Sequence, residues 1–438
     1  MSAPRSENEL RIHAAVDCPS KKPVTAMRGI VAASGLFGLL VFATAVASCA
    51  ESESAVAPQE PPTTVPEAGS PQTDAAADAS ADADCLDAGD GGCTTNELTC
   101  AEADFCAVPT GVDLRYALFG VWGSSDKDVW AVGSAGTVIH WDGTAWTGVP
   151  LGRKETMRGV GGRSANDVFV VSSLDVVLHS DGFKNGSATF TAEPTLDPID
   201  PTNFMGATLT KVWAANTGEL FVGGPATAGW SPPNSLWRHH PGADEYSTWE
   251  AASTYCAEDP CLSANDIWGT SASDIWVVGQ SGGLRRSKGP VGNGGGPEQW
   301  TNVKTTVTTA NLNGIWGSSA SDVWIVGDGG TIRHWSNDGT ERWEIVPSPT
   351  KENLRAVWGT SPTDAWAVGD AGTILHWDGK TWSFATATLP VGPKPRLYGI
   401  WGSGPNDVWV VGEAIALHFT GPKSSGAPRT RGEADKAN

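Results

Sequence analysis

The sequence predicts an all-β fold, a seven-bladed β-propeller, and three observations lead to it. All 21 Trp residues lie between Trp122 and Trp409. A unit of about 40 to 55 residues recurs seven times in this region, a period typical of propeller blades rather than of helical repeats. Each unit contains short runs of β-branched and aromatic residues bounded by Gly, Ser and Asp, which predict four strands per blade.

The repeat is clearest in its first copy. It reads Leu-Phe-Gly-Val-Trp-Gly-Ser-Ser from Leu118, Asp-Val-Trp-Ala-Val-Gly from Asp128 and His-Trp-Asp-Gly from His140. Its second run is apolar at successive positions, so both faces should be buried between neighbouring blades. The Asp-Gly pair at 142–143 predicts a hairpin between the third and fourth strands. Four close copies and two degenerate ones follow, with first-strand positions at Gly161, Trp213, Trp268, Trp316, Trp358 and Trp401.

The last unit stops near Phe419 and lacks a fourth strand. The segment Phe105–Pro109 has the aromatic-x-x-Val-Pro form of the fourth strands at Trp146–Pro150 and Trp343–Pro347. We expect it to be the outer strand of the last blade, paired with residues 416–419. Such pairing would close the ring and remove its open edge.

These residues resemble the bacterial extracytoplasmic β-propellers built of Trp-Gly-Ser, Asp-Val-Trp-x-Val-Gly and His-Trp-Asp-Gly repeats, which are grouped loosely with BNR and Asp-box proteins. The resemblance covers about residues 105–420 and implies the propeller fold. The segment Asp378–Trp382 is Asp-box-like, although it is one residue shorter than an Asp-box.

The N-terminus has the pattern of an export signal. Gly29 to Ser48 carries no charge, Arg28 precedes it, and small residues lead to Cys49. This junction resembles the lipobox of bacterial lipoproteins, which implies lipidation of Cys49 as a membrane anchor. Plain secretion and an uncleaved spanning helix are the alternatives. A start at Met27 would give a signal of ordinary length.

The domain boundaries follow from these patterns and from composition. Residues 50–104 contain 13 acidic residues and no Lys or Arg, with few large apolar residues to offset the entropy of ordering. The chain is therefore divided into an over-long start or basic extension (1–26), a lipoprotein signal peptide (27–48), a disordered acidic linker (49–92), a seven-bladed propeller (93–420) and a disordered tail (421–438).

Six cysteines remain after Cys18 and the lipidated Cys49 are set aside, and an even number in an exported chain predicts disulfides. Cys256 and Cys261 close a short loop and are expected to form a local bridge. The four others allow three pairings, which the sequence does not separate: Cys85, Cys93, Cys100 and Cys106. No Cys-x-x-Cys pair marks a zinc site.

Six His residues occupy one repeat position, but they lie on separate blades and cannot share one metal ion. We expect them to form hydrogen bonds along the strand, and the Asp that opens each second strand to cap the preceding turn. We predict no metal and no cofactor. The His positions are His140, His179, His239, His334, His376 and His418, with Arg286 in the fourth unit.

The net charge of −20 argues against a nucleic-acid partner, because phosphate binding needs clustered Lys and Arg. No local catalytic motif occurs, so an enzyme is the less favoured class. We expect a monomeric, lipid-anchored binding or scaffold module for a protein or glycan, in the cell envelope, with the outer membrane or cell surface favoured. The alternatives are a carbohydrate-active hydrolase of BNR or sialidase-like style and an export-side assembly factor.

Two features would discriminate these functions and locate the ligand. Clustered acids and bases at the mouth of the axial channel would favour an enzyme, and a smooth Ser, Gly and Trp lining would favour binding. Three long connections fall on one face around the second to fourth blades. Trp230 lies in one of them and fits no repeat position, so it is the ligand-binding candidate.

Overall fold

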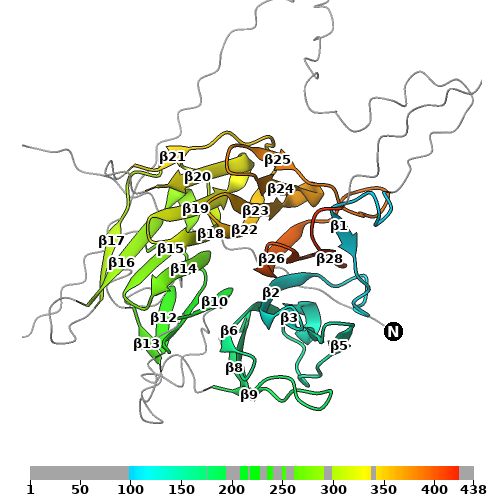
Figure 1. Ribbon diagram of the computed structural model, residues 1–438. Helices are drawn as coiled ribbons and strands as arrows, with labels where there is room; N and C mark the ends of the chain where they lie inside the picture. Colours follow the sequence, from blue (N-terminus) through cyan, green and yellow to red (C-terminus); the bar gives the residue numbers. More distant parts are fainter. Residues whose placement is uncertain are drawn as a thin grey trace, which may run out of the picture. The chain divides into compact units, whose positions relative to one another are not determined.

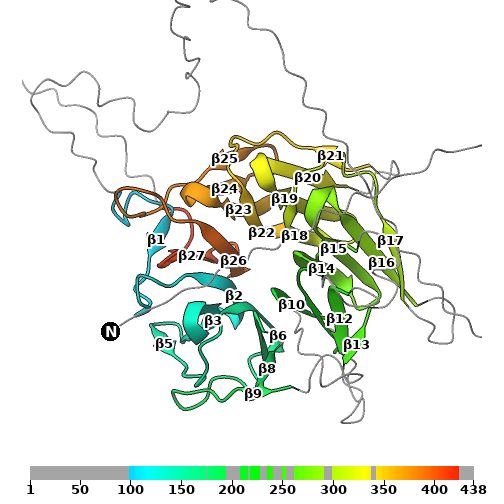
Figure 2. The same cartoon turned by 180° about the vertical axis from the view of Figure 1, so that it is seen from behind.

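The computed structural model of the chain describes residues 98–174, 176–193, 208–215, 218–226, 234–239, 249–252, 261–290, 298–336 and 342–423. These residues form seven antiparallel four-stranded sheets, arranged as blades around a central axis (Figure 1). Figure 2 shows the same ring from behind. The predicted seven-bladed β-propeller is confirmed. Within the described ranges, no helix is long and apolar enough to cross a membrane.

Among the described residues, six blades use four strands in chain order and the seventh takes its fourth strand from the N-terminal side of the chain. The first strands of neighbouring blades contact one another around the axis. The first blade contains β2 (Leu118–Ser125), β3 (Asp128–Gly133), β4 (Val138–Trp141) and β5 (Trp146–Gly148). The second contains β6 (Met157–Ser164), β7 (Asp167–Ser172), β8 (Val177–Ser180) and β9 (Thr191–Ala192). The third contains β10 (Lys211–Ala214), β11 (Leu220–Gly223), β12 (Leu236–His239) and β13 (Trp249–Ala251).

The remaining blades follow the same plan. The fourth contains β14 (Asp266–Ser271), β15 (Asp274–Val278), β16 (Leu284–Pro290) and β17 (Glu298–Asn302). The fifth contains β18 (Leu312–Ser319), β19 (Asp322–Gly327), β20 (Thr331–Trp335) and β21 (Glu344–Ile345). The sixth contains β22 (Leu354–Ser361), β23 (Asp364–Gly369), β24 (Ile374–Trp377) and β25 (Trp382–Phe384). The seventh contains β26 (Leu397–Gly404), β27 (Asp407–Gly412), β28 (Ile415–Phe419) and β1 (Phe105–Ala107).

The ring is closed by its N-terminal strand, as the sequence predicts. β1 pairs antiparallel with β28, with Phe105 opposite Phe419, and Figure 1 shows the two strands side by side. Phe105 is fully buried. Its ring centroid lies 5.2 Å from that of Trp366 and 5.4 Å from that of Phe419. The first described strand therefore completes the core of the last blade.

Tryptophan rings join the regular blades. Trp324 on the second strand of the fifth blade is fully buried. Its ring lies 4.9 Å from Trp377 and 5.3 Å from Trp382, both in the sixth blade. The second pair is edge-to-face, and aromatic pairs of this kind add to the stabilisation from burial of their large apolar area. The burial of this strand on both faces confirms the prediction from its unbroken apolar run.

The Gly of each Trp-Gly-Ser segment accommodates the Trp of the preceding blade. A Cβ built on Gly359 would lie 2.8 Å from the ring of Trp316 and 2.6 Å from the backbone oxygen of Asp364. The second blade has Gly161 in place of that Trp, and the third blade has Ala214 in place of that Gly. The two departures match, because a small residue in one blade leaves room for a methyl group in the next.

The two faces of the ring differ in their connections. The turns from second to third strands and the links from fourth to first strands share one face, which we call the upper face. Here Ser134 N donates to Ala117 O at 2.9 Å, so the two connections of the first blade are joined. In the tight turn Ser134–Gly136, Ala135 has φ 54°, a left-handed conformation. The lower face carries the other hairpins.

The repeat His and Asp residues pair with each other. His376 Nε2 lies 2.8 Å from Asp364 Oδ1, and the Thr360 hydroxyl donates to Asp364 Oδ2. Asp364 therefore does bridge the turn, through the Thr360 hydroxyl, but its other oxygen accepts from His376, a pairing that the sequence did not predict. In the fourth blade, Arg286 Nε donates to Asp274 Oδ1 at 2.9 Å. Equivalent pairs are Asp128–His140, Asp167–His179, Asp322–His334 and Asp407–His418.

Burial raises the pKa of Asp364, but the hydrogen bonds from His376 and Thr360 more than offset this effect, so the net pKa is lowered from its ordinary value of 3.8. The repeat His ring also stacks on the second-strand Trp. His376 lies 3.9 Å from Trp366, with an interplanar angle of 20°. The repeat position thus has a structural role, as expected for His. The assignment of His239 to this position is wrong by one residue, because Arg238 stands opposite Phe221 as His376 stands opposite Trp366.

Three of the cysteines with predicted roles lie within the described residues, namely Cys100, Cys106 and Cys261. Cys100 and Cys106 are free cysteines, and the Cys106 thiol donates to Cys100 O at 3.4 Å. Burial, with a further contribution from Cys100, raises the pKa of the Cys106 thiol to about 11. Cys261 Sγ lies 3.7 Å from Ser235 Oγ. The positions outside the described residues are Cys49, Cys85, Cys93, Cys256 and Trp230, and the predictions for them stand as predictions.

Candidate functional site: the polar mouth of the ring

Five inner strands have a β-bulge at the same place, where the strand leaves the upper face. In β2, for example, the register shifts between Leu118 and Gly120, so Phe119 has no partner in the ladder. A bulge re-aims the side chain at its extra residue. The five bulge residues are Phe119, Arg158, Asn313, Arg355 and Tyr398.

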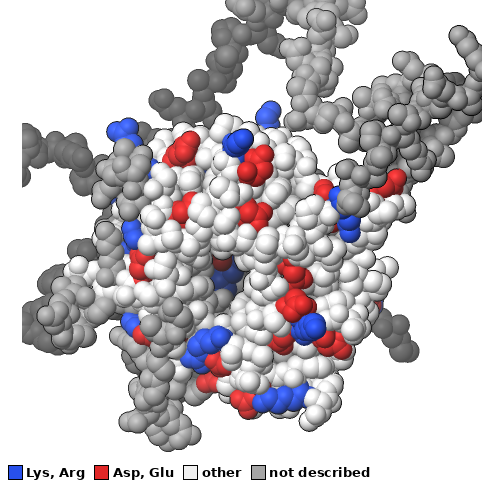
Figure 3. All heavy atoms as spheres, viewed as in Figure 1, with Lys and Arg blue, Asp and Glu red and all other residues white. Residues whose placement is uncertain are grey.

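These bulge residues meet around the axis. The ring of Phe119 lies 5.1 Å from that of Tyr398 in the seventh blade. The guanidinium carbon of Arg158 lies 4.5 Å above the Phe119 ring, from the second blade. Asn313 Nδ2 donates to Leu354 O of the sixth blade at 3.0 Å. We call this opening, lined by the five bulge residues, the channel mouth. Figure 3 shows a hollow at the centre of the ring with Lys or Arg atoms inside it.

The sixth blade contributes an ion pair to the mouth. Arg355 binds Asp370 through two hydrogen bonds, Nε to Oδ1 at 2.9 Å and Nη2 to Oδ2 at 2.7 Å. Asn353 Nδ2 donates to the same Oδ2 at 3.1 Å. Asp370 opens the tight turn Asp370–Gly372, so a turn residue fixes the direction of a bulge residue.

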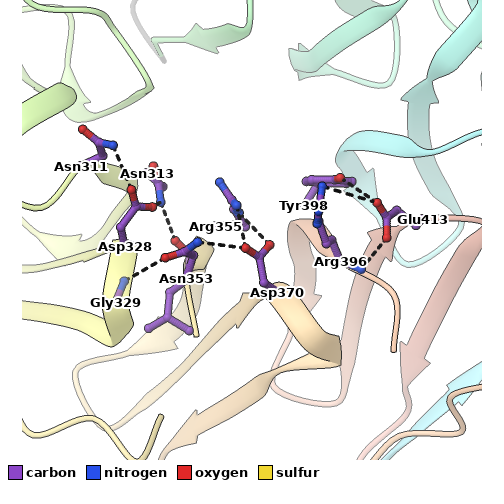
Figure 4. A network of polar contacts seen from close by, with 11 residues as sticks. Asn311, Asn313, Asp328, Gly329, Asn353, Arg355, Asp370, Arg396, Tyr398 and Glu413 are labelled. Atoms are coloured by element: carbon purple, nitrogen blue, oxygen red, sulfur yellow. Dashed lines mark hydrogen bonds and ion pairs between the residues drawn. The ribbon is translucent and has the colours of Figure 1, made fainter. Parts of the chain in front are cut away.

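The fifth and seventh blades repeat this arrangement with other side chains. In the fifth, Asp328 of the turn accepts hydrogen bonds from Asn311 at 2.9 Å and from Asn313 at 2.8 Å. In the seventh, the Tyr398 hydroxyl donates to Glu413 Oε1 at 3.2 Å. Arg396 N donates to Glu413 Oε2 at 3.0 Å. Figure 4 shows the whole network as an arc across these three blades.

In their described residues, the second, third and fourth blades do not repeat this turn-to-bulge contact at the mouth. Lys211 Nζ lies 3.5 Å from Asp266 Oδ1, which joins the third and fourth blades. Asp266 Oδ2 also accepts from Ile315 N at 3.0 Å. Arg158 differs from these groups. Within the part of the chain that the structure describes, its side chain makes no hydrogen bond or ion pair, and its buried Nε lacks a partner.

The chemistry of the mouth suits binding better than proton transfer. Burial raises the pKa of Asp370, but the bonds from Arg355 and Asn353 outweigh this effect, so the net pKa is lowered. An ionised carboxylate with both oxygens occupied is a poor general acid. The mouth has neither a smooth Ser, Gly and Trp lining nor a cluster of free acids and bases. Among the described residues, no group of three or more His, Cys, Asp or Glu is arranged to hold a metal ion.

The sequence pointed to the mouth of the axial channel as informative, but the residues that line it were not identified from the sequence. The predicted ligand position is instead on the upper face around Trp230, which is outside the described residues, and the first strands were predicted only as elements of the fold. The signal was nevertheless present in the regular units. Their second residue reads Phe119, Asn313, Arg355 and Tyr398, and it changes while its neighbours stay nearly the same. A variable position inside a regular strand can mark a position that is not needed for packing.

Comparison with known proteins supports the fold. No family model and no curated protein matches the chain. A solved structure described as YCF48 bound to D1 peptide is similar over 73% of this chain and 94% of that chain, at 18% identity and a TM-score of 0.53. A second, YCF48 from Cyanidioschyzon merolae, covers 72% and 98%, at 18% identity and a TM-score of 0.48. At this identity the likeness to the first structure shows a shared propeller fold.

Proposed function

We propose that this chain is a non-enzymatic binding module that holds an extended segment of a partner protein at the channel mouth. The observation that carries the proposal is the set of five bulges, which direct five side chains of four types to one opening. The propeller core does not require these bulge residues to differ. A rigid scaffold that presents varied side chains at one place is typical of a recognition site.

The residue types at the mouth favour a protein segment. Aromatic and Arg side chains are enriched where partner proteins bind most strongly, because they bury large areas and also form directed hydrogen bonds. Phe119, Tyr398 and Arg158 form such a set. The YCF48 propeller bound to a D1 peptide gives a precedent for peptide binding on this fold. A glycan is the alternative ligand, and a hydrolase is disfavoured by the occupied carboxylate of Asp370.

The proposal places the module on the outer side of a membrane, held by lipid at Cys49 and separated from the membrane by the acidic linker 49–92. The export pattern from Met27 to Cys49 supports this location. Cys49→Ser should block processing or release the protein from membranes, and fractionation would measure this. Unchanged membrane association of a fully processed Cys49→Ser protein would contradict lipid anchoring.

The binding function is tested by selecting ligands from a displayed library of random peptides, with a glycan array run in parallel. We expect peptides to be enriched and Phe119→Ala to weaken their binding by about 2 kcal/mol, the typical loss for a central aromatic anchor. Leu114→Ala is the matched control, since Leu114 lies on the connection before β2 and is 82% exposed. Enrichment of glycans alone, or equal affinities of the two variants, would contradict the proposal.

A further inference from the structure

We propose that Arg158 is an anion anchor in the channel mouth and that it binds a carboxylate of the partner segment. This inference rests on the proposed function and names the chemistry by which the site selects its ligand. It starts from a contrast among the cations of the mouth. Arg355 is neutralised by Asp370, Arg396 lies 3.9 Å from Glu413, and Lys211 is paired with Asp266.

Arg158 alone among these cations has no carboxylate partner in the described part of the chain. Its Nε is buried without a hydrogen-bond acceptor. A buried donor that is left unpaired loses its hydration without compensation, and a charged donor loses more than a neutral one. A bound carboxylate would supply the missing negative charge and would accept from the terminal N–H groups of Arg158, which, unlike Nε, are not buried.

The structure also holds Arg158 in a fixed direction. The bulge between Met157 and Gly159 sets its backbone, and its guanidinium lies 4.5 Å above the ring of Phe119. Phe119 in turn packs against Tyr398 at 5.1 Å. Stacking on an aromatic face leaves the edge of the guanidinium free, and that edge carries the N–H groups that match a carboxylate.

A carboxylate is favoured over a phosphate by the surroundings. The mouth already contains the carboxylates of Asp370, Asp266 and Glu413, each held by its own cation or hydrogen-bond donors. A group with one negative charge balances the single unpaired guanidinium. A doubly charged phosphate would leave an excess negative charge beside these carboxylates.

The test is a double-mutant cycle on peptides selected against the full mature chain. Each acidic residue of a selected peptide is replaced by its amide, and the C-terminus is amidated in a separate peptide. We expect one of these changes to weaken binding to the native protein about tenfold or more, as for a hydrogen bond to a charged group. With Arg158→Gln the same change should have little effect, because the anchor is gone.

Two further variants keep the cycle decisive. Arg115→Gln removes a charge from the connection before β2, where the Arg115 side chain is 81% exposed, and it should leave the tenfold difference intact. Arg158→Lys keeps the charge but not the planar set of N–H donors. In this variant, replacing the peptide carboxylate should therefore weaken binding by an intermediate factor. Because Arg158→Lys preserves a cation, it replaces Arg158→Gln if the latter fails to fold.

The outcomes separate this inference from the proposed function. If no peptide is enriched, both fail. If peptides bind at Phe119 but no carboxylate replacement changes their affinity, the anchor is wrong and the binding module stands. Equal sensitivity to carboxylate loss in the native protein and in Arg158→Gln would also overturn the anchor.

Discussion

The sixth and third blades have the same four-stranded plan but differ in the acid, the base and the second-strand ring that mark the repeat. The sixth has the Asp364–His376 pair with the ring of Trp366 stacked on it. In the third, Arg238 Nη2 donates to Glu219 Oε1 at 3.0 Å, and its guanidinium lies 5.6 Å from the ring of Phe221. An acid, a base and an aromatic ring occur in both blades.

The difference teaches that the fold depends on a contact rather than on a motif. An acidic side chain at the start of the second strand meets a basic or His side chain on the third, beside an aromatic ring. The fourth blade makes the same contact with Asp274 and Arg286, whose guanidinium lies 4.1 Å from the ring of Trp276. Degenerate repeats can therefore form blades while their connections and inner-strand residues diverge.

The largest expected effect concerns the closing strand, which no other blade takes from a distant part of the chain. Phe105→Ala should reduce the free energy of unfolding by about 3 to 5 kcal/mol, because it leaves a cavity between Trp366 and Phe419. Ile345→Ala is the control on an ordinary outer strand, where Ile345 is 59% exposed. Denaturant unfolding measures the free energy of unfolding of both variants, and similar decreases would contradict a special role for the closing strand.

A smaller effect should distinguish regular from degenerate blade contacts. Gly359→Ala should cost about 1 to 3 kcal/mol, because the new methyl group overlaps Trp316 and the backbone of Asp364. Ala214→Gly is the opposite substitution at the equivalent position of the third blade, where the preceding blade has Gly161 instead of a Trp. It should cost only about 0.5 to 1 kcal/mol, through backbone entropy. If the two substitutions were equally destabilising, the matching of Gly161 with Ala214 would have no packing basis.

The smallest effect concerns pH. Since the pKa of Asp364 is lowered in the folded chain, its contribution to stability is present above the ordinary value of 3.8 and is lost as the pH falls through the folded pKa. Asp364→Asn removes this titration. The variant should be less stable at neutral pH and should lose less further stability below about pH 3.8. Parallel curves of unfolding free energy against pH would show that Asp364 does not contribute in this way.

Most of the fold could be predicted because its signals are local and repeated. Strand order, closure by Phe105–Ala107 and burial of the second strands all follow from spacing and residue type. The Asp–His pairing was missed, because the sequence shows that His and Asp recur but not that two strands bring them together. The residues that line the channel mouth were missed for a related reason. A bulge at Phe119 or Arg158 depends on ladder register between strands, which residue type alone does not reveal.

The central claim is that a partner segment lies at the channel mouth on the upper face, and site-specific photocrosslinking tests it most directly. A crosslinking residue placed at Phe119 reports on the mouth, and one placed at Lys127 reports on the lower face, where the turn between β2 and β3 is exposed. We predict that selected peptides crosslink from position 119 and not from position 127. Crosslinking from 127 with none from 119 would contradict the account.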